Sequence, residues 1–183
     1  TAFAVSAQQL KLPTVIGSGM VLQQNENVNI WGWAKPSAKI TVKAQWLAEA
    51  VKTKADDEGK WIVSLSTPAG SYERYSMSVS DGKSAIDLED IMIGEVWLCS
   101  GQSNMVFMLR QATNAKENIA EALTKKDLRI YDMRPRVYTD AINWDSISLA
   151  KLNRLDYYLP TQWQTLTTDN APQFSAIAYH FGA

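Results

Sequence analysis

Short runs of alternating apolar and polar residues recur between Leu10 and Ile91, and this pattern is the strongest constraint on the fold. Turn residues separate the runs, which cover 28–33, 39–46, 50–55, 60–66, 72–80 and 84–88. Period-two alternation directs apolar side chains to one face of a strand, and no helical period interrupts the series. Several short strands at regular spacing predict an antiparallel β-sandwich over residues 8–91.

Two turn signals predict hairpins within this region. Residues 50–55 and 60–66 flank Asp56-Asp57-Glu58-Gly59, and residues 72–80 and 84–88 flank Asp81-Gly82. Asp-Gly between alternating runs is a strong hairpin signal. We therefore expect each pair of runs to lie side by side.

The pattern changes after Ile91, where a second domain is expected over residues 92–183. Glu95 to Cys99 is expected to be a strand, and its apolar run from Val96 to Cys99 is typical of a strand that is buried on both faces. Residues 114–126 carry a helical stripe with Thr113 or Asn114 as the cap, and 128–133 read as another strand. Strand, helix and strand predict a parallel βαβ unit.

The remainder of the chain does not complete such a domain. Residues 134–168 are predicted to be mostly loop with a short helix near 146–152. A further helix is expected to open at Asn170-Ala171-Pro172, with one apolar stripe formed by Phe174, Ile177, Ala178 and Phe181. One βαβ unit and one helix cannot cover both faces of a parallel sheet. We expect the missing strands and helices in a part lost by truncation or cleavage, or in a separate chain.

Composition excludes several function classes. The formal net charge is −1, which gives no electrostatic case for a nucleic-acid partner. No apolar stretch approaches the ~20 residues that span a bilayer, so no membrane partner is expected. One histidine and one cysteine, with no clustered carboxylates, predict neither a metal site nor a cofactor. Cys99 is expected to be a buried small apolar residue.

Residues 1–7 are small and apolar, and Val5-Ser6-Ala7 matches a signal-peptidase cleavage pattern. We interpret them as the tail of a signal peptide, which predicts a secreted or periplasmic protein. An expression remnant is the alternative.

Ser103 is the candidate catalytic residue. It follows the apolar run in Ser100-Gly101-Gln102-Ser103-Asn104, where a strand would reach the edge of its sheet. A serine there can serve as a nucleophile once a base removes its proton. A turn serine that caps a helix is the alternative. The Gly-x-Ser-x-Gly elbow of α/β-hydrolases is excluded because Met105 occupies the second glycine position.

Four sequence blocks resemble the sialate O-acetylesterase family of SGNH (GDSL-like) hydrolases. They are GEVWLCSGQSNM at 94–105, GMVLQQNENVNIWGWAKPSAKITV at 19–42, ADDEGKWIVSL at 55–65 and FSAIAYHFGA at 174–183. The resemblance implies a β-sandwich followed by the start of a flavodoxin-like α/β hydrolase domain. It also implies metal-free removal of acetyl groups from carbohydrates such as sialic acid or plant polysaccharides.

The resemblance places the nucleophile, and one backbone oxyanion donor, on Ser103. Gln102 and Asn104 flank it as candidate substrate-binding residues. Val106 to Leu109 are apolar where family members often carry polar residues and a proline. The family's base, an Asp-x-x-His pair, and its Gly and Asn oxyanion donors are not found. His180 is the sole histidine and is interpreted as a packing or surface residue. The chain alone is therefore expected to be inactive.

A non-catalytic carbohydrate-binding or interaction module is the alternative function. Aromatic faces suit sugar rings, and the chain contains seven tryptophans. Burial in the core or between strands is the competing interpretation, which we favour, for Trp31, Trp33, Trp61 and Trp97.

Overall fold

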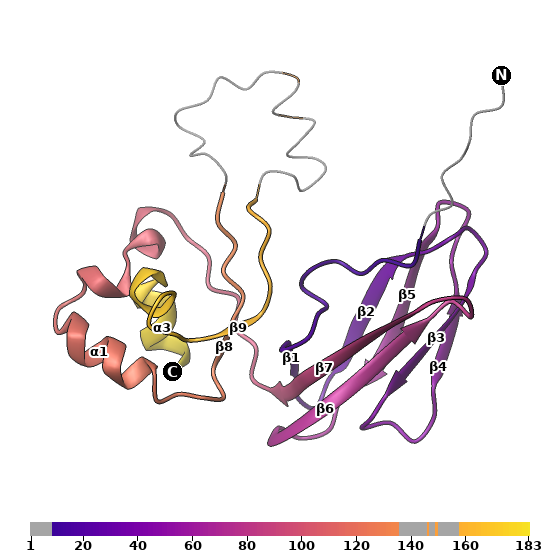
Figure 1. Cartoon of the computed structure of the whole chain (residues 1–183), viewed down its shortest axis with the longest axis horizontal. Coiled ribbons are helices and arrows are strands. Elements are labelled where there is room, and N and C mark those ends of the chain that lie inside the picture. The colour runs from indigo at the N-terminus through magenta and orange to yellow at the C-terminus, as the bar shows by residue number, and fades with distance from the viewer. Residues whose placement is uncertain (1–8, 136–145, 147–148, 150–157) are drawn as a thin grey trace.

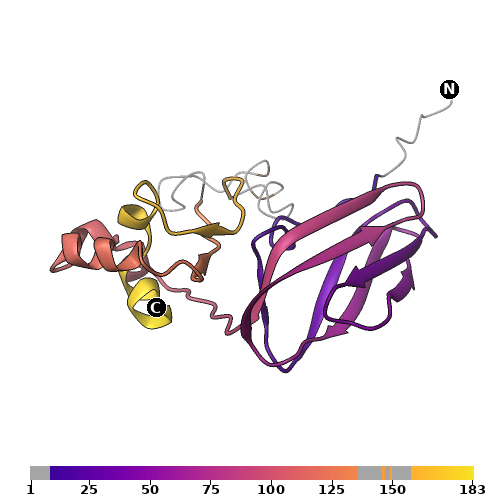
Figure 2. The same cartoon turned by 60° about the horizontal axis from the view of Figure 1, so that its bottom comes forward.

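The structure is a computed structural model that describes residues 9–135, 146, 149 and 158–183. Figures 1 and 2 show strands β1–β7 at one end of the molecule and helices α1 and α3 at the other. The seven strands are β1 (Val21–Gln23), β2 (Asn27–Trp33), β3 (Lys39–Ala44), β4 (Val51–Lys54), β5 (Lys60–Ser66), β6 (Ser71–Ser80) and β7 (Ala85–Gly94). The alternating runs of the sequence thus form strands close to their predicted limits.

The strands form a curled mixed sheet and a smaller second sheet. The five-stranded sheet has the order β1-β7-β6-β3-β4, and β2 pairs with β5 alone. β1 runs parallel to β7, whereas the other pairs are antiparallel. The prediction of wholly antiparallel strands is therefore wrong at β1. A parallel pair needs a long connection, and the chain between β1 and β7 is long enough because it contains β2 to β6.

One predicted hairpin forms and the other does not. β6 and β7 pair around Asp81-Gly82, with Ser80 opposite Ala85. The Asp81 carboxylate accepts hydrogen bonds from the backbone N–H groups that follow it, and these bonds lower its pKa. By contrast, β4 pairs with β3 and β5 pairs with β2. The turn at residues 56–59 carries the chain from one sheet to the other, so the expected β4–β5 hairpin is wrong.

The main core contains side chains from both sheets. Ile30 and Leu65 of the two-stranded sheet are fully buried, as are Val42, Val79 and Ile91 of the five-stranded sheet. Trp61, Val63 and Leu65 of β5 are buried, whereas Ile62 on the opposite face of the strand is exposed. Burial on this scale stabilises a domain by about 1.5–3 kcal/mol for each large side chain.

Residues after Gly94 form a smaller unit with its own core. Its described elements are α1 (Ala115–Ala122), β8 (Arg129–Ile130), β9 (Gln164–Thr165), α3 (Ala176–Gly182) and the short 3-10 helices η1 (Ser103–Val106), η2 (Leu109–Gln111) and η4 (Ala171–Gln173). Its buried side chains are Leu109, Ala122, Ile130, Leu166, Ala171, Ala176 and Tyr179. Asn114 precedes α1 in a left-handed conformation and makes no side-chain cap bond.

This unit differs from the predicted βαβ arrangement. Residues 95–99 form no strand, and Cys99 is exposed rather than buried. The expected strand at 128–133 is reduced to β8, which pairs with β9 in antiparallel orientation. A continuous apolar run becomes a buried strand only when neighbours cover both of its faces. The described residues supply no such neighbours, and in them no parallel pair links two strands of this unit.

The last helix also starts later and faces differently than predicted. Its N-cap is Ser175, whose Oγ accepts a hydrogen bond from the backbone N–H of Ala178 at 3.3 Å. The buried residues of α3 are Ala176 and Tyr179, whereas Ile177 and Phe181 of the predicted stripe are exposed. The stripe prediction is therefore wrong in its choice of face.

Ser146 and Leu149 are helical where a short helix was predicted. The rest of that segment lies outside the described residues, as does Val5-Ser6-Ala7.

An ion-pair network joins the two units. Asp90 of β7 pairs with Arg74 at 2.9 Å and with Arg129 at 3.1 Å, and Arg74 also pairs with Asp127. The Arg129 side chain is only 3% exposed. The indole N–H of Trp163 adds a hydrogen bond to the Val15 carbonyl at 2.8 Å. These contacts hold the smaller unit against the sheets.

Candidate active site

The segment that leads to Ser103 is held where it leaves the sheet. Two glutamines at the end of β1 hold it: the Glu95 carboxylate accepts hydrogen bonds from Gln24 Nε2 at 2.6 Å and Gln23 Nε2 at 3.2 Å. Gln23 Oε1 accepts the Val96 backbone N–H at 2.8 Å. The hydrogen bonds from Gln24, and then Gln23, lower the pKa of Glu95.

This pair of glutamines was missed from the sequence as part of the site. Both lie in the block 19–42 that carries the resemblance, but nothing in a Gln-Gln pair signals its distant partner. The contact joins residues more than seventy positions apart. Only the parallel pairing of β1 with β7 brings the glutamines next to Glu95.

Ser103 is the first residue of η1 and is exposed to solvent. The N-cap is Gln102, whose carbonyl accepts the Met105 N–H at 2.9 Å. No hydrogen bond of the Gln102, Ser103 or Asn104 side chains occurs within the described residues, and the N–H groups of Ser103 and Asn104 are also unbonded there. Ser103 therefore does not cap a helix through its side chain. Its hydroxyl and adjacent N–H groups are free to contact an ester.

Gly101 leaves room for the turn that presents Ser103. A Cβ at this position would lie 2.6 Å from Cγ of Met105, which is half-buried beneath the turn. Any larger residue must therefore move the Met105 side chain. The absence of a side chain on Gly101 therefore permits Gly101 and Met105, which lie on either side of Ser103, to approach closely.

His180 does not serve Ser103 in this structure. It is exposed on α3 and stacks edge-on against Tyr179, with ring centroids 5.2 Å apart. It lines a hollow of about 550 Å³ with Phe107, Thr113, Ile177 and Phe181, and Ser103 does not line this hollow. Among the described residues no histidine, aspartate or glutamate makes a hydrogen bond to Ser103. A general base must lie within hydrogen-bond reach of the proton that it takes.

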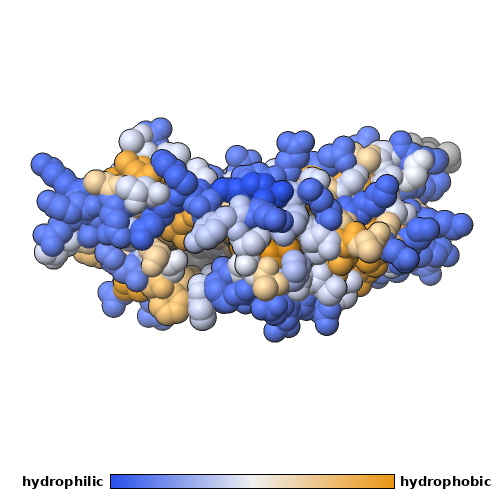
Figure 3. Space-filling view, turned by 90° about the horizontal axis from the view of Figure 1, so that it is seen from below, coloured by the Kyte–Doolittle hydropathy of each residue, from blue (hydrophilic) through white to orange (hydrophobic). Residues whose placement is uncertain are grey.

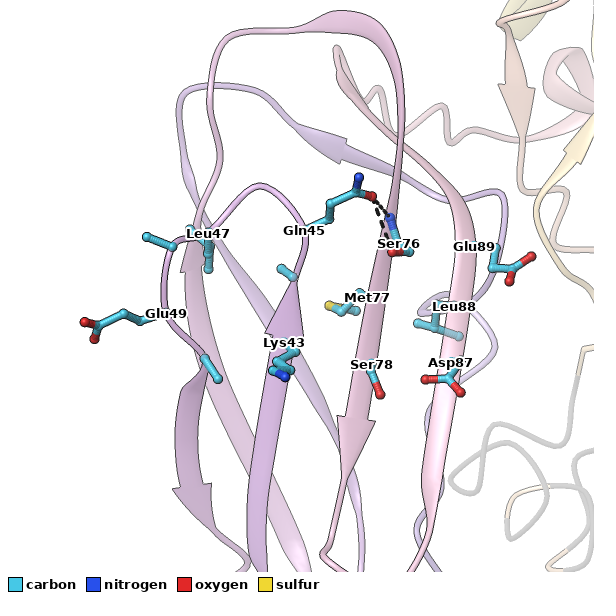
Figure 4. Close-up of a pocket in the computed structure, with 13 residues that line it drawn as sticks. Lys43, Gln45, Leu47, Glu49, Ser76, Met77, Ser78, Asp87, Leu88 and Glu89 are labelled. Carbon is cyan, nitrogen blue, oxygen red and sulfur yellow. Dashed lines mark hydrogen bonds between the residues drawn. The ribbon is translucent and has the colours of Figure 1, made fainter.

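A second hollow, of about 540 Å³, lies on the sheet (Figure 4), and no residue of the Ser103 segment lines it. β3, β6, β7 and the loop after β3 line it, and Gln45 Oε1 accepts the Ser76 N–H at 3.0 Å. Lys43, Glu49 and Asp87 give it mixed charge, and no aromatic residue lines it. It therefore lacks the aromatic face that would favour sugar binding.

The tryptophans divide between core and surface. Trp61 is buried at 4% exposure, Trp33 is half-buried, and Trp31 and Trp97 are 39% and 60% exposed. The prediction of burial is thus confirmed for Trp61 and wrong for Trp97.

In the part of the chain that the structure describes, no helix is long and apolar enough to cross a membrane.

Comparison with known proteins identifies proteins that are similar to this chain in sequence and in structure. No family model matches the chain. A sialate O-acetylesterase of Pongo abelii is 29% identical over 185 residues, covering 94% of this chain and 33% of the relative. The sialate O-acetylesterase of Homo sapiens is 29% identical over 133 residues, covering 68% of this chain and 25% of its own length. The chain thus spans about a third or less of the relatives' length.

A solved structure supports the same relationship. The crystal structure of a carbohydrate acetylesterase from Xanthomonas citri superimposes with a TM-score of 0.71 at 27% identity, covering 94% of this chain and 36% of that one. Both comparisons thus find acetylesterases that are similar to this chain over 94% of its length. The chain is therefore related to the sialate O-acetylesterase family and matches the N-terminal part of its members.

Proposed function

We propose that this chain is the nucleophile-bearing part of a secreted or periplasmic carbohydrate O-acetylesterase. One observation carries the proposal. Ser103 stands exposed and without a hydrogen-bond partner among the described residues, in a chain of which 94% matches sialate O-acetylesterases. In this view residues 8–91 are a β-sandwich domain and residues 92–183 are the first part of an SGNH hydrolase domain.

The reaction would proceed through an acyl-enzyme. Ser103 Oγ attacks the acetyl carbonyl while a base takes its proton, and the backbone N–H of Ser103 donates to the resulting oxyanion. The acyl C–O bond to the sugar then breaks, the base gives the proton to the leaving sugar oxygen, which becomes a hydroxyl, and acetyl-Ser103 remains. Water hydrolyses this ester and releases acetate. Gln102 and Asn104 flank the reacting centre, where their amides can bind the substrate.

The base and the remaining oxyanion donors belong to a part of the enzyme outside these 183 residues. The exposed His180 lines a different hollow from the Ser103 turn. Without a base the serine hydroxyl is a weak nucleophile. The isolated chain should therefore hydrolyse acetyl esters no faster than a heat-denatured control.

Activity measurements on two proteins test this proposal. The first is the 183-residue chain, and the second extends it by the polypeptide that its gene encodes downstream. With 4-nitrophenyl acetate and O-acetylated sialic acid, the extended protein should be active. Ser103→Ala should lower its kcat by about a thousandfold or more. Ser100→Ala, three residues earlier on the same exposed segment, is the matched control and should retain activity.

Acyl-enzyme trapping adds a direct readout. Rapid acid quench and peptide mass spectrometry should find the acetyl group on the peptide that contains Ser103, and not in the Ser103→Ala variant. Full activity of that variant would refute the nucleophile assignment. Robust, Ser103-dependent hydrolysis by the 183-residue chain alone would refute the proposal that the base lies outside these residues.

A further inference from the structure

Four exposed lysines share the outer face of the paired strands β3 and β4: Lys39, Lys43, Lys52 and Lys54. The alternate residues of β3 point to the opposite face and are buried in the core. Residues two positions apart on a strand share a face, and so do residues directly opposite each other on a paired strand. The register places Lys54 opposite Lys39 and Lys52 opposite Thr41, so the four ammonium groups lie on one surface. We call these four residues the lysine face.

The charge of this region differs from that of the whole chain. Residues 39–54 contain four lysines and one glutamate, a formal charge of +3, whereas the whole chain has −1 and the remaining residues therefore have −4. Figure 3 shows hydrophilic side chains over most of the molecular face that it draws, so a hydrophilic surface alone does not indicate a binding site. The separation of positive charge onto one pair of strands is what distinguishes this surface.

The lysines of this face have no acidic partners. None of them makes an ion pair or a side-chain hydrogen bond with any residue that the structure describes, including Glu49 in the loop after β3. Lys39 lies directly opposite Lys54, and like charges in such a pair destabilise a sheet. Asp87 shares this face of the sheet, but it lies on β7, which β6 separates from β3 by a spacing of about 10 Å. The fold thus contains a repulsion that an anionic partner would relieve.

Protection of a sheet edge explains only half of these lysines. β4 is an edge strand, and lysines on an edge strand hinder its pairing with other chains. That role suits Lys52 and Lys54. Lys39 and Lys43 lie on β3, which pairs with β4 on one side and β6 on the other and therefore has no free edge. A role in binding accounts for all four.

Hydroxyl groups extend the lysine face toward β6. Thr41 lies between Lys39 and Lys43 along β3, and Ser78 of β6 lies opposite Lys43. Both hydroxyl-bearing side chains are half-buried, and neither makes a hydrogen bond within the described residues. A hydroxyl both donates and accepts, so these two groups suit the hydroxyls of a sugar, whereas the ammonium groups suit carboxylates. The hollow beside Lys43 offers no aromatic ring for stacking, so charge must supply most of the affinity.

We propose that the lysine face binds a polysaccharide whose sugars carry carboxylates. The choice of a polysaccharide among polyanions rests on the proposed function, because that enzyme acts on carbohydrates. The four lysines are also unaccompanied by the arginines and stacking aromatic rings that are typical of nucleic-acid sites. β3 and β4 lie at the end of the molecule away from α1 and α3 (Figures 1 and 2). A polymer bound there holds the enzyme on its substrate and leaves the Ser103 turn unoccupied.

Binding of polygalacturonate to the 183-residue chain tests this proposal. Each sugar of this polymer carries one carboxylate, and its fully methyl-esterified form is the neutral match. In isothermal titration calorimetry at about 0.01 M salt, where the screening length is ~30 Å, the chain should bind the acid form and not the ester. At about 1 M salt the screening length falls to ~3 Å, and binding should be lost.

Two double variants with the same change in charge locate the binding. Lys39→Gln/Lys54→Gln should weaken binding by about fivefold or more, as expected for the loss of two exposed ion pairs. Its midpoint in urea should be no lower than that of the parent, because it removes the repulsion between opposed lysines. Lys116→Gln/Lys126→Gln is the control, because it removes two exposed lysines in and just after α1, and it should leave binding unchanged.

The outcomes separate this inference from the proposed function, because binding is measured without catalysis. Binding of polygalacturonate, with an extended protein that lacks esterase activity, would support the lysine face and refute the function. An active extended protein, with no binding of the acid form, would do the reverse. Equal weakening by the two double variants would overturn the lysine face. Duplex DNA that binds as tightly as polygalacturonate would overturn the choice of a polysaccharide.

Discussion

Replacing Gly32 with alanine should destabilise the protein severely. Gly32 lies in β2 opposite Trp61, and a Cβ there would be 2.3 Å from the Lys11 carbonyl oxygen and 2.9 Å from Cζ2 of Trp61. Lys11 also exchanges two backbone hydrogen bonds with Trp33, at 2.8 and 2.9 Å. The alanine methyl group can be accommodated only if Lys11 moves away and the buried indole is displaced.

The magnitude follows from these contacts. Moving Lys11 away sacrifices both hydrogen bonds, at about 1 kcal/mol each. Displacing the Trp61 ring, which is 4% exposed, adds an overpacking cost of about 1–3 kcal/mol. Alanine restricts the unfolded chain and returns about 0.4–1 kcal/mol. The free energy of unfolding should therefore fall by about 2–4 kcal/mol.

Urea unfolding followed by tryptophan fluorescence measures this loss. With an m value of about 2 kcal/mol/M, the midpoint should fall by about 1–2 M. Gly94→Ala is the matched control, because the nearest atom to its Cβ would be Val21 Cγ1 at 3.9 Å, an ordinary contact. A Gly32→Ala variant within about 1 kcal/mol of the parent would show that the Lys11 segment moves freely, and would refute the reasoning.

Three further predictions follow from polar groups in the structure. Thr67→Val removes a buried hydroxyl that accepts one backbone N–H and donates to a carbonyl, so unfolding in urea should show a loss of about 1–3 kcal/mol; unchanged stability would contradict this. Tyr179→Phe removes a buried hydroxyl with no partner among the described residues and should be neutral or stabilising by about 1 kcal/mol; a marked loss would reveal a partner. Because burial raises the pKa of Tyr179, the parent, but not this variant, should also lose tyrosine-linked stability as the pH rises above the ordinary tyrosine pKa. In Gln24→Leu, an NMR titration should show the lowered pKa of Glu95 moving back toward its ordinary value. The parent loses stability as the pH falls through the folded-state pKa of Glu95, and this loss should be smaller in the variant. An unchanged pKa of Glu95 would refute the assigned hydrogen bond.

The local pattern predicted the strands but not all of their partners. Alternation from Asn27 to Trp33 and from Lys60 to Ser66 appears directly in the burial of β2 and β5, because a strand's two faces depend only on its own residues. Their pairing with each other, in place of β4 with β5, depends on which arrangement buries both apolar faces in one core. That choice involves the whole chain and leaves no local signal.

The candidate site shows the same division. The sequence by itself singled out Ser103 as the candidate nucleophile, since the family resemblance rests on a contiguous block of residue types. Only the tertiary structure decided that Glu95 is held by Gln23 and Gln24, that Trp97 and Leu98 face solvent, and that α3 buries Ala176 and Tyr179. The physical reason is that burial is a property of what packs against a segment, and a run of apolar residues predicts a strand without specifying the neighbours that must cover it.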